Sequence, residues 1–206
     1  MKKFNFIPTR AAGLERLKIF LPSAGNYYAA LRNYDLGQNN HTNVSMLSPY
    51  IRHRSLTEIE VLKSVLCYHS KKSSEKFVQE VFWRTYWKGW LEMRPTVWSN
   101  YRTKLNRLGD DLKTQSGFRK SWEDACEGKT GIDCFDSWAK ELFDTGYLHN
   151  HARMWFASIW IHTLKLPWEL GADFFLRNLL DGDPASNTLG WRWVGGAQTV
   201  GKTYLA

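Results

Sequence analysis

The sequence predicts an all-α protein, and three observations support this prediction. Several segments are amphipathic at helical spacing. Runs of alternating β-branched residues bounded by hairpin turns, which are typical of strands, are scarce. Two helix-start signals, Ser48-Pro49 and Thr57 with Glu60, stand directly before apolar segments. The 206 residues suit one sizeable domain and leave little room for a second, so we expect a single domain over residues 1–206.

The N-terminal half of the chain predicts a series of short helices. We expect an amphipathic helix over residues 11–21, a second beginning near residues 27–31, and a polar loop over residues 37–43. Ser48 as N-cap and Pro49 at the first helical position predict the next helix. Thr57 and Glu60 have the spacing of a capping box, which predicts a helix running toward Tyr68.

The C-terminal half predicts longer and more apolar helices. Residues 75–92 carry apolar side chains on nearly all faces, which predicts a largely buried helix. The polar segment 94–117 is expected to be irregular surface structure. Further helices are expected over the ranges 131–145, 146–166 (ending before Pro167) and 171–180, the last of them followed by a tight turn at 181–187.

The amino-acid composition indicates a packed core and the kind of molecule that the protein could bind. Hydrophobic residues make up 43% of the chain, enough for a core, and 11 tryptophans favour packed or stacking positions. The formal net charge of +8 favours polyanions such as nucleic acid, although a merely basic soluble protein would have the same charge. Three cysteines without C-x-x-C spacing predict neither a disulfide framework nor a metal site.

Signals for secretion and for membranes are missing from the sequence. The N-terminus has basic residues but no apolar segment of the kind found in signal peptides. The longest apolar stretch, Met154 to Trp168, contains Ser158, His162 and Lys165 and is too short and too polar to cross a bilayer. We therefore expect a cytoplasmic protein with no membrane partner.

A phosphate-loop motif near the C-terminus is interpreted as a chance match. Residues 196–203 fit the pattern G-x-x-x-x-G-K-T. That pattern binds phosphate only between a strand and a helix, because the loop and the helix N-terminus supply the N–H groups. The sequence predicts no buried strand before this segment and has three residues after it.

Three groups of polar residues fall on helices or turns that are otherwise apolar. The first two have i, i+3 and i+4 spacing, which puts their members on one helix face. The groups are Glu80, Trp83 and Arg84; Asn150, Arg153 and Met154; and Asp181, Asp183 and Asn187. Buried charges are costly unless they are paired or bound to something. A structural ion pair beside a packed tryptophan would explain the first group, but together the three favour a large polar cofactor.

These residues resemble a known family. The segments 146–154, 179–187 and 190–193, which read GYLHNHARM, LLDGDPASN and GWRW, are similar to the signature of the cryptochrome/photolyase family. The resemblance extends back through Trp83-Arg84 to residues 45–50 and 28–32, and it covers residues 10–195. It implies an all-helical domain that holds FAD in a bent conformation. Photolyases use light-excited reduced flavin to split pyrimidine dimers in DNA, whereas cryptochromes use flavin photoreduction to signal.

The resemblance also implies roles for individual residues. The positions that match FAD-contacting residues are Tyr28, Ser45, Leu47, Ser48, Phe77, Arg84, Asn150, Arg153, Asp181, Asp183 and Asn187. The positions that match the lesion pocket are Glu80, Trp83, Asn150, Met154 and Trp193. Trp191 and Trp168 match the inner two members of a tryptophan chain that reduces the flavin in light, and Trp98 and Trp122 are candidates for the outer member.

The sequence departs from the family pattern at both ends. No antenna domain precedes the helical part, and the chain stops soon after Trp193, so we expect a domain truncated at its C-terminal end. Either the flavin pocket is more open, or a partner chain or a second copy completes it. Three interpretations stay open: a photolyase-like flavoprotein acting on DNA, a flavin photosensor or interaction module, and a degenerate domain that has lost FAD.

Overall fold

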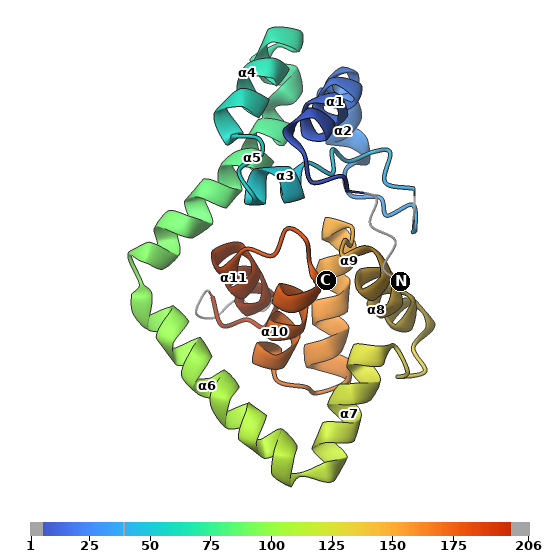
Figure 1. Cartoon of the computed structure of the whole chain (residues 1–206), viewed down its shortest axis with the longest axis vertical. Helices are drawn as coiled ribbons and strands as arrows, with labels where there is room; N and C mark the ends of the chain where they lie inside the picture. The colour runs from blue at the N-terminus through green and yellow to red at the C-terminus, as the bar shows by residue number, and fades with distance from the viewer. Residues whose placement is uncertain (1–5, 39, 199–206) are drawn as a thin grey trace. The chain divides into compact units, whose positions relative to one another are not determined.

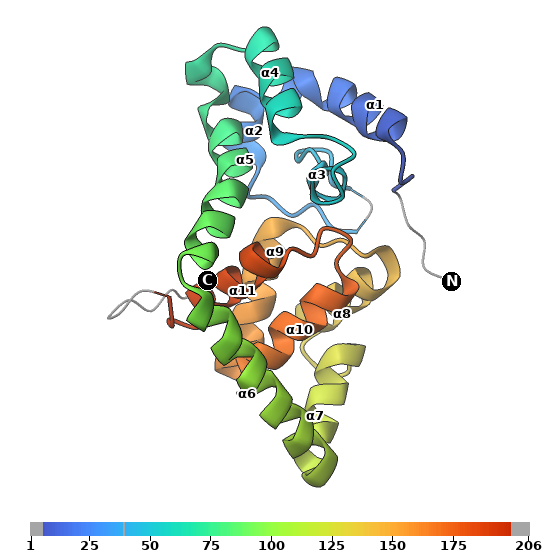
Figure 2. The same cartoon turned by 60° about the vertical axis from the view of Figure 1, so that its left-hand side comes forward.

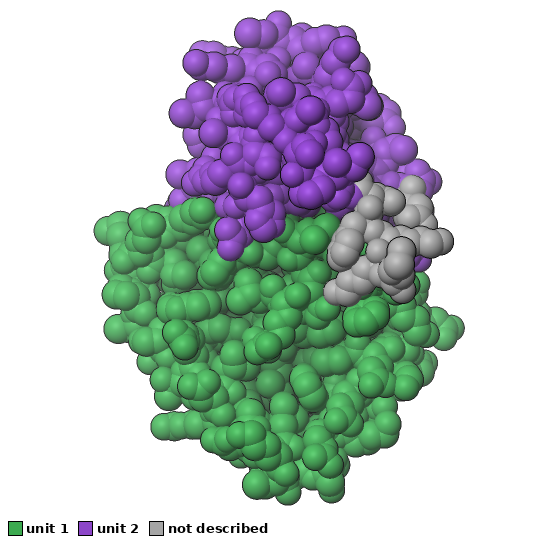
Figure 3. All heavy atoms as spheres, in the orientation of Figure 1, with its two compact units in different colours: residues 1–3, 87–206 green, residues 4–86 purple. Residues whose placement is uncertain are grey.

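The computed structural model describes residues 6–38 and 40–198, and within these ranges the chain forms helices and loops without a strand (Figures 1 and 2). The all-α prediction is therefore confirmed. The chain divides into two compact units, which are coloured separately in Figure 3. We call residues 4–86 the N-terminal unit and residues 87–206 with 1–3 the C-terminal unit, and each is described by itself.

The N-terminal unit is a cluster of short helices around an aromatic core. Its elements are α1 (Arg10–Phe20), η1 (Leu21–Ser23), α2 (Asn26–Leu31), α3 (Ser48–Arg52), α4 (Glu58–Tyr68) and most of α5 (Lys71–Glu92). The Phe77 ring lies 5.3 Å from that of Phe20 and 5.2 Å from that of Tyr28. These ring contacts pack α5 against the end of α1 and against α2.

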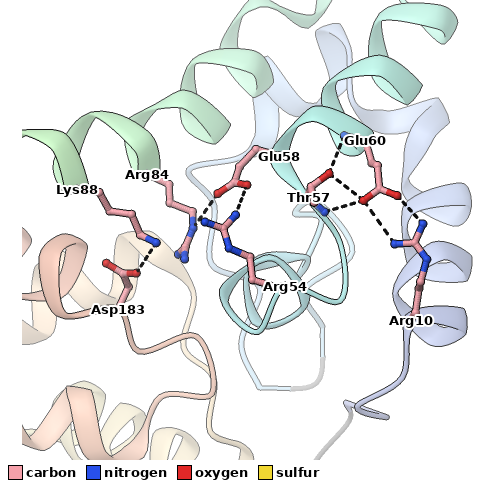
Figure 4. Close-up of polar contacts among 8 residues, drawn as sticks. All are labelled: Arg10, Arg54, Thr57, Glu58, Glu60, Arg84, Lys88 and Asp183. Carbon is pink, nitrogen blue, oxygen red and sulfur yellow. Dashed lines mark hydrogen bonds and ion pairs between the residues drawn. The ribbon is translucent and has the colours of Figure 1, made fainter.

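The capping box predicted for α4 is present. The Thr57 hydroxyl accepts a hydrogen bond from the Glu60 backbone N–H at 3.3 Å, and a Glu60 carboxylate oxygen accepts one from the Thr57 N–H at 2.9 Å. Arg10 of α1 also pairs with Glu60 (Figure 4). The hydrogen bonds from Arg10 and Thr57 lower the pKa of Glu60 to about 2. One carboxylate thus closes the first turn of α4 and ties it to α1.

The C-terminal unit is built around a larger aromatic core. Its helices are α6 (Pro95–Thr114), α7 (Ser116–Glu127), α8 (Asp133–Thr145), α9 (Asn150–Ser158), the π-helix η2 (Ile159–Thr163), α10 (Trp168–Asn178) and α11 (Pro184–Val194). Phe156 and Trp160 are fully buried and stack at 5.9 Å, and Phe175 packs edge-on against Trp191 at 5.0 Å. Gly128 and Gly146, at φ 64° and 70°, end α7 and α8 in the left-handed region.

The prediction that segment 94–117 is irregular was wrong, because α6 and the start of α7 occupy it. The α6 residues that pack on the core are spaced at three and four: Trp98, Tyr101, Leu105, Leu108 and Leu112. Abundant polar residues between these positions obscured a narrow apolar stripe. The predicted tight turn at 181–187 was also wrong in part, since Asp183 is the N-cap of a further helix, α11.

Three other details of the helix prediction were wrong. Ser48 is the first residue of α3, and Leu47 holds the N-cap position without a side-chain hydrogen bond. Helix α9 begins at Asn150 rather than at residue 146. Helix α5 is not largely buried, because Phe82, Trp83 and Tyr86 are 55%, 47% and 52% exposed. Its buried stripe consists of Ser74, Phe77 and Val81 alone.

None of the helices in the described ranges is long and apolar enough to cross a membrane. The same ranges contain no group of three or more histidine, cysteine or acidic side chains placed to hold a metal ion.

Loss of the α4 cap should destabilise the protein. The substitution Thr57→Ala removes a hydrogen-bond acceptor for the Glu60 N–H, and we expect it to lower the free energy of unfolding by about 1 kcal/mol. Urea unfolding followed by circular dichroism at 222 nm, a generic helix signal, would measure the change. The control Thr103→Ala lies on the exposed surface of α6 and should change stability by less than about 0.5 kcal/mol.

Candidate functional site

The loop between α10 and α11 carries two buried carboxylates. Asp183 is 5% exposed, and its Oδ1 accepts hydrogen bonds from the backbone N–H groups of Ala185 and Ser186, both at 3.1 Å. Its Oδ2 lies 3.6 Å from the Lys88 ammonium, at the end of α5 (Figure 4). Asp183 therefore starts α11 and is charge-compensated by a lysine that the sequence did not single out.

Asp181, two residues earlier, forms a buried ion pair with Arg153 of α9. The Arg153 Nη2 donates to Asp181 Oδ2 at 2.9 Å, and the Arg153 Nε donates to the Leu148 carbonyl at 2.9 Å. Burial lowers the pKa of Arg153, but the charge of Asp181 outweighs it and the pKa is raised. Asp181 Oδ1 is buried and has no hydrogen-bond partner among the described residues. A carboxylate oxygen in this state is suited to accept a hydrogen bond from a ligand.

Asn187, one turn into α11, has its side-chain amide oriented by α10. Its Nδ2 donates to the Ala172 carbonyl at 2.7 Å. Because the amide nitrogen is engaged with α10, the side-chain oxygen is the group that remains to accept a hydrogen bond.

Trp191 follows Asn187 by one helical turn and packs directly on the α10 backbone. A Cβ atom added at Gly171 would lie 2.3 Å from the Trp191 ring, so only glycine allows this approach. Trp191 is 3% exposed, and Trp168 lies one turn before Gly171 on α10, where it is half-buried. No sequence pattern indicates the role of Gly171, since a glycine within a helix has many possible explanations.

The charged residues of α5 within the N-terminal unit belong to an ion-pair network. Arg84 Nε lies 3.2 Å from Glu58 Oε1, and Arg54 Nη1 lies 2.7 Å from Glu58 Oε2 (Figure 4). Burial raises the pKa of Glu58, but a backbone hydrogen bond and the two arginines lower it by more. Arg84 therefore forms a structural ion pair with Glu58 of α4, a residue outside the group that the sequence singled out.

Glu80 and Trp83 lie on the more exposed side of α5. Glu80 Oε1 is 3.9 Å from the Arg32 Nε, and its side chain is 45% exposed. Burial by neighbouring atoms raises the pKa of Glu80, against the opposing charges of Arg32 and Lys76. The Trp83 ring meets the Tyr86 ring edge-on at 5.3 Å. Glu80 thus has a raised pKa and lies near an exposed aromatic surface.

The other predicted site residues range from fully buried core positions to exposed positions. Tyr28, Phe77 and Leu47 are buried in the core of the N-terminal unit. Ser45 accepts a hydrogen bond from the Leu47 N–H at 3.3 Å and shapes the turn before α3, to which Ser48 belongs. In the C-terminal unit, Asn150 is exposed at the start of α9, while Met154 and Trp193 are half-buried.

The structure brings several predicted residues of the C-terminal unit together, and another group of predicted residues belongs to the N-terminal unit. Arg153 pairs with Asp181, and the loop from Asp181 leads through Asp183 to the helix that carries Asn187 and Trp191. Tyr28, Ser45, Leu47, Ser48, Phe77, Glu80, Trp83 and Arg84 belong to the N-terminal unit.

Comparison with known proteins identifies the family. Residues 77–205 match the FAD binding domain of DNA photolyase. The chain belongs to this family. The resemblance drawn from the sequence is therefore confirmed, and FAD is the cofactor of the family.

Individual relatives agree with this assignment. A deoxyribodipyrimidine photo-lyase of Streptomyces griseus is 33% identical over 156 residues, which is 75% of this chain and 32% of that protein. A class III photolyase of Agrobacterium tumefaciens matches 97% of this chain and 40% of its own, with a TM-score of 0.78 and 24% identity. A cryptochrome of Synechocystis matches 99% of this chain and 43% of its own, with a TM-score of 0.77 and 25% identity.

The chain spans only 32–39% of the length of three curated photo-lyases that it matches.

The residues of the C-terminal unit fit a flavin. FAD carries polar ring and sugar groups beside an apolar ring, and the buried Asp181 Oδ1 and the oriented Asn187 oxygen can each accept a hydrogen bond from such groups. Trp191, one turn after Asn187 on the same helix, is buried and adds an aromatic ring to this part of the core.

Breaking the Arg153–Asp181 ion pair should lower the free energy of unfolding much more than breaking the exposed pair of Asp173 and Arg177. Asp181→Asn leaves the Arg153 guanidinium buried without a countercharge, and we expect a loss of about 3 kcal/mol in the free energy of unfolding. The control Asp173→Asn removes an ion pair with Arg177, whose side chain is 74% exposed, and should cost less than about 1 kcal/mol. Equal losses in urea unfolding would contradict the assignment.

Adding one methyl group at Gly171 should displace Trp191. The clash at 2.3 Å cannot be relieved without moving the indole ring, so Gly171→Ala should destabilise the protein by about 1–3 kcal/mol. The near-ultraviolet circular dichroism of the tryptophans should change as well. Gly109→Ala, on α6 with open space around the new methyl group, should instead stabilise by about 0.5–1 kcal/mol.

Proposed function

We propose that this chain is the flavin-holding part of a photolyase that splits pyrimidine dimers in DNA. The observation on which the proposal depends most is the loop that ends α10, where a buried, ion-paired Asp181 keeps one carboxylate oxygen without a partner among the described residues. The names of the relatives support the reaction, because the curated proteins that match are deoxyribodipyrimidine photo-lyases.

We assign the contacts to FAD as follows. Asp181 and Asn187 accept hydrogen bonds from the flavin, and Arg153 fixes the Asp181 carboxylate. The remaining assigned contacts come from Tyr28, Ser45, Leu47, Ser48, Phe77, Arg84, Asn150 and Asp183. Two of these act mainly through packing or capping: Phe77 lies in the core of its unit, and Asp183 holds the start of α11.

Bound FAD in its reduced form supplies, under light, the electron that splits the dimer. The protein residues prepare this chemistry. Asn187 presents its side-chain oxygen, which favours a flavin nitrogen that carries a proton. The Arg153–Asp181 pair fixes the carboxylate in place beside a positive charge. The apolar core behind α10 and α11 excludes water from one side of the site.

We assign the lesion contacts to Glu80, Trp83, Asn150, Met154 and Trp193. A dimer turned out of the helix needs an apolar or aromatic wall and a hydrogen-bonding group. Trp83 offers an exposed indole, and burial raises the pKa of Glu80, whose carboxyl group in its neutral form can donate a hydrogen bond to a pyrimidine carbonyl. Asn150 is exposed and can serve either as donor or as acceptor.

DNA is the proposed partner, and the net charge of +8 supports it by attracting the phosphate backbone. We place this reaction in the cytoplasm. A second copy or a partner chain that completes the site remains part of the proposal.

A flavin photosensor is the second candidate, and the likeness to the Synechocystis cryptochrome favours it together with Trp191 and Trp168. A repair assay separates the two functions. The protein loaded with FAD is illuminated with a dimer-bearing oligonucleotide, and restored thymines are measured. Repair supports the photolyase proposal. Photoreduction of FAD without repair supports the sensor, and a colourless protein that FAD does not reconstitute supports the degenerate domain.

The pH dependence of repair should reveal the role of Glu80. Because burial raises its pKa, the neutral donor form persists above the ordinary carboxyl range, and its contribution to repair and to stability is lost as the pH rises through the raised value. Glu80→Gln keeps an N–H donor at every pH and should flatten the profile of the repair rate. The control Glu75→Gln lies exposed on the same helix and should leave the profile unchanged. Identical profiles for wild type and Glu80→Gln would contradict the role.

A further inference from the structure

A buried asparagine clamps the segment that leads into α3 to the end of α2 (Figure 2). Asn43 is 1% exposed, and its Nδ2 donates hydrogen bonds to the carbonyls of Leu31 and Tyr34, both at 2.6 Å. Leu31 is the last residue of α2, and the final carbonyls of a helix have no partner within the helix itself. Asn43 therefore closes the end of α2 from a position 12 residues further along the chain.

This clamp connects two groups of proposed FAD contacts. Tyr28 lies one turn before the end of α2, and Ser45 follows Asn43 by two residues. The Ser45 hydroxyl accepts a hydrogen bond from the Leu47 N–H at 3.3 Å, which shapes the turn after Asn43. A displacement of Asn43 would therefore move the segment 45–48 relative to the helix that carries Tyr28.

The backbone next to Ser45 needs such support, because Met46 lies in the left-handed region at φ 50°. This conformation is unfavourable for a residue with a side chain and persists only where the surroundings hold it. On one side of Met46, Asn43 fixes the chain to α2, and on the other side Leu47 is 1% exposed in the core of the N-terminal unit. The Arg16 guanidinium also contacts the Met46 sulfur at 3.4 Å. The segment is thus fixed at both ends in a conformation that it would not keep alone.

We propose that Asn43 is a positioning residue for the cofactor, which holds the segment 45–48 in the conformation that presents Ser45, Leu47 and Ser48 to FAD. This inference rests on the proposed flavin function and adds a residue that acts through its neighbours. A segment that is fixed before the ligand arrives loses little conformational entropy on binding. The clamp therefore increases the affinity for FAD.

The geometry requires an amide at Asn43. The carbonyls of Leu31 and Tyr34 each accept a hydrogen, and a side-chain NH2 group supplies two. Because Asn43 Oδ1 has no hydrogen-bond partner among the described residues, the two Nδ2 bonds alone orient the side chain. Asn43→Asp keeps nearly the same shape, but its carboxylate has no hydrogen for either carbonyl and repels both.

The first test compares the FAD affinities of Asn43→Ala and Asn43→Asp, with the dissociation constant taken from the change in flavin fluorescence. Loss of the two hydrogen bonds should raise the Kd for FAD about tenfold in both variants. The control Asn33→Ala lies exposed in the turn between Leu31 and Tyr34 and should bind FAD like the wild type. Wild-type affinity in Asn43→Asp would overturn the proposal, because that variant keeps the shape of the side chain and loses the donors.

A double-mutant cycle separates positioning from a general loss of stability. If Asn43 acts through the segment 45–48, Ser45→Ala should reduce the effect of Asn43→Ala on the Kd for FAD. The double variant should then bind several-fold more tightly than the product of the two single effects predicts. The same cycle with Asn187→Ala, whose amide is bound to Ala172 in the C-terminal unit, should give multiplicative effects. Multiplicative effects in both cycles would overturn the positioning role.

The clamp can also be followed in the flavin-free protein by hydrogen–deuterium exchange, so that a variant that fails to fold is recognised. In Asn43→Ala, the amides of residues 44–48 should exchange faster than in the wild type, and those of α4 should exchange as before. Unchanged exchange over residues 44–48 would show that Asn43 does not hold this segment. An equal increase in α4 would show that the substitution loosens the whole unit, which contradicts a local role.

The outcome is independent of DNA repair. A protein whose FAD affinity depends on Asn43 but which repairs no dimers contradicts the proposed photolyase function alone. A protein that repairs dimers and binds FAD equally well without Asn43 contradicts this inference alone.

Discussion

The contact between Trp191 and Gly171 is the constraint on which the C-terminal unit depends most. The missing side chain at Gly171 lets α11 approach the backbone of α10, so the indole fills a position that a methyl group would occupy. The same crossing brings the amide of Asn187, one turn before Trp191, to the carbonyl of Ala172, the residue after Gly171. An aromatic packing contact and an oriented amide thus share one helix crossing, and neither can shift without the other.

Two carboxylates, whose first role is structural, hold the loop between these helices in place. Asp181 compensates Arg153, and Asp183 caps α11 and faces Lys88. The Leu180 N–H also donates to the Gly146 carbonyl at 2.8 Å, which ties the loop to the residue that ends α8. A loop fixed at several points can hold an acceptor such as Asp181 Oδ1 in place, because little conformational entropy is left to lose when a ligand binds.

The sequence predicted the fold class and most helices, and the reasons for its failures are physical. The capping box at Thr57 was found because it depends on residues three apart in the chain. Helix α6 was missed because its apolar stripe is narrow and the rest of its surface is polar. The burial of α5 was overestimated because aromatic residues occur on several faces of the helix, while only one stripe reaches the core of its unit.

By itself, the sequence determined the all-helical class, the family and the chemical types at the candidate site. Motif order and spacing are local properties of the chain, and they suffice to pair Arg153 with an acid near residue 181 by resemblance. Only the tertiary structure decided that Glu58 is the partner of Arg84, that Lys88 faces Asp183, and that Tyr101 stands between Trp168 and Trp98. These contacts join residues on different helices, and their formation depends on how the helices pack, which no local spacing encodes.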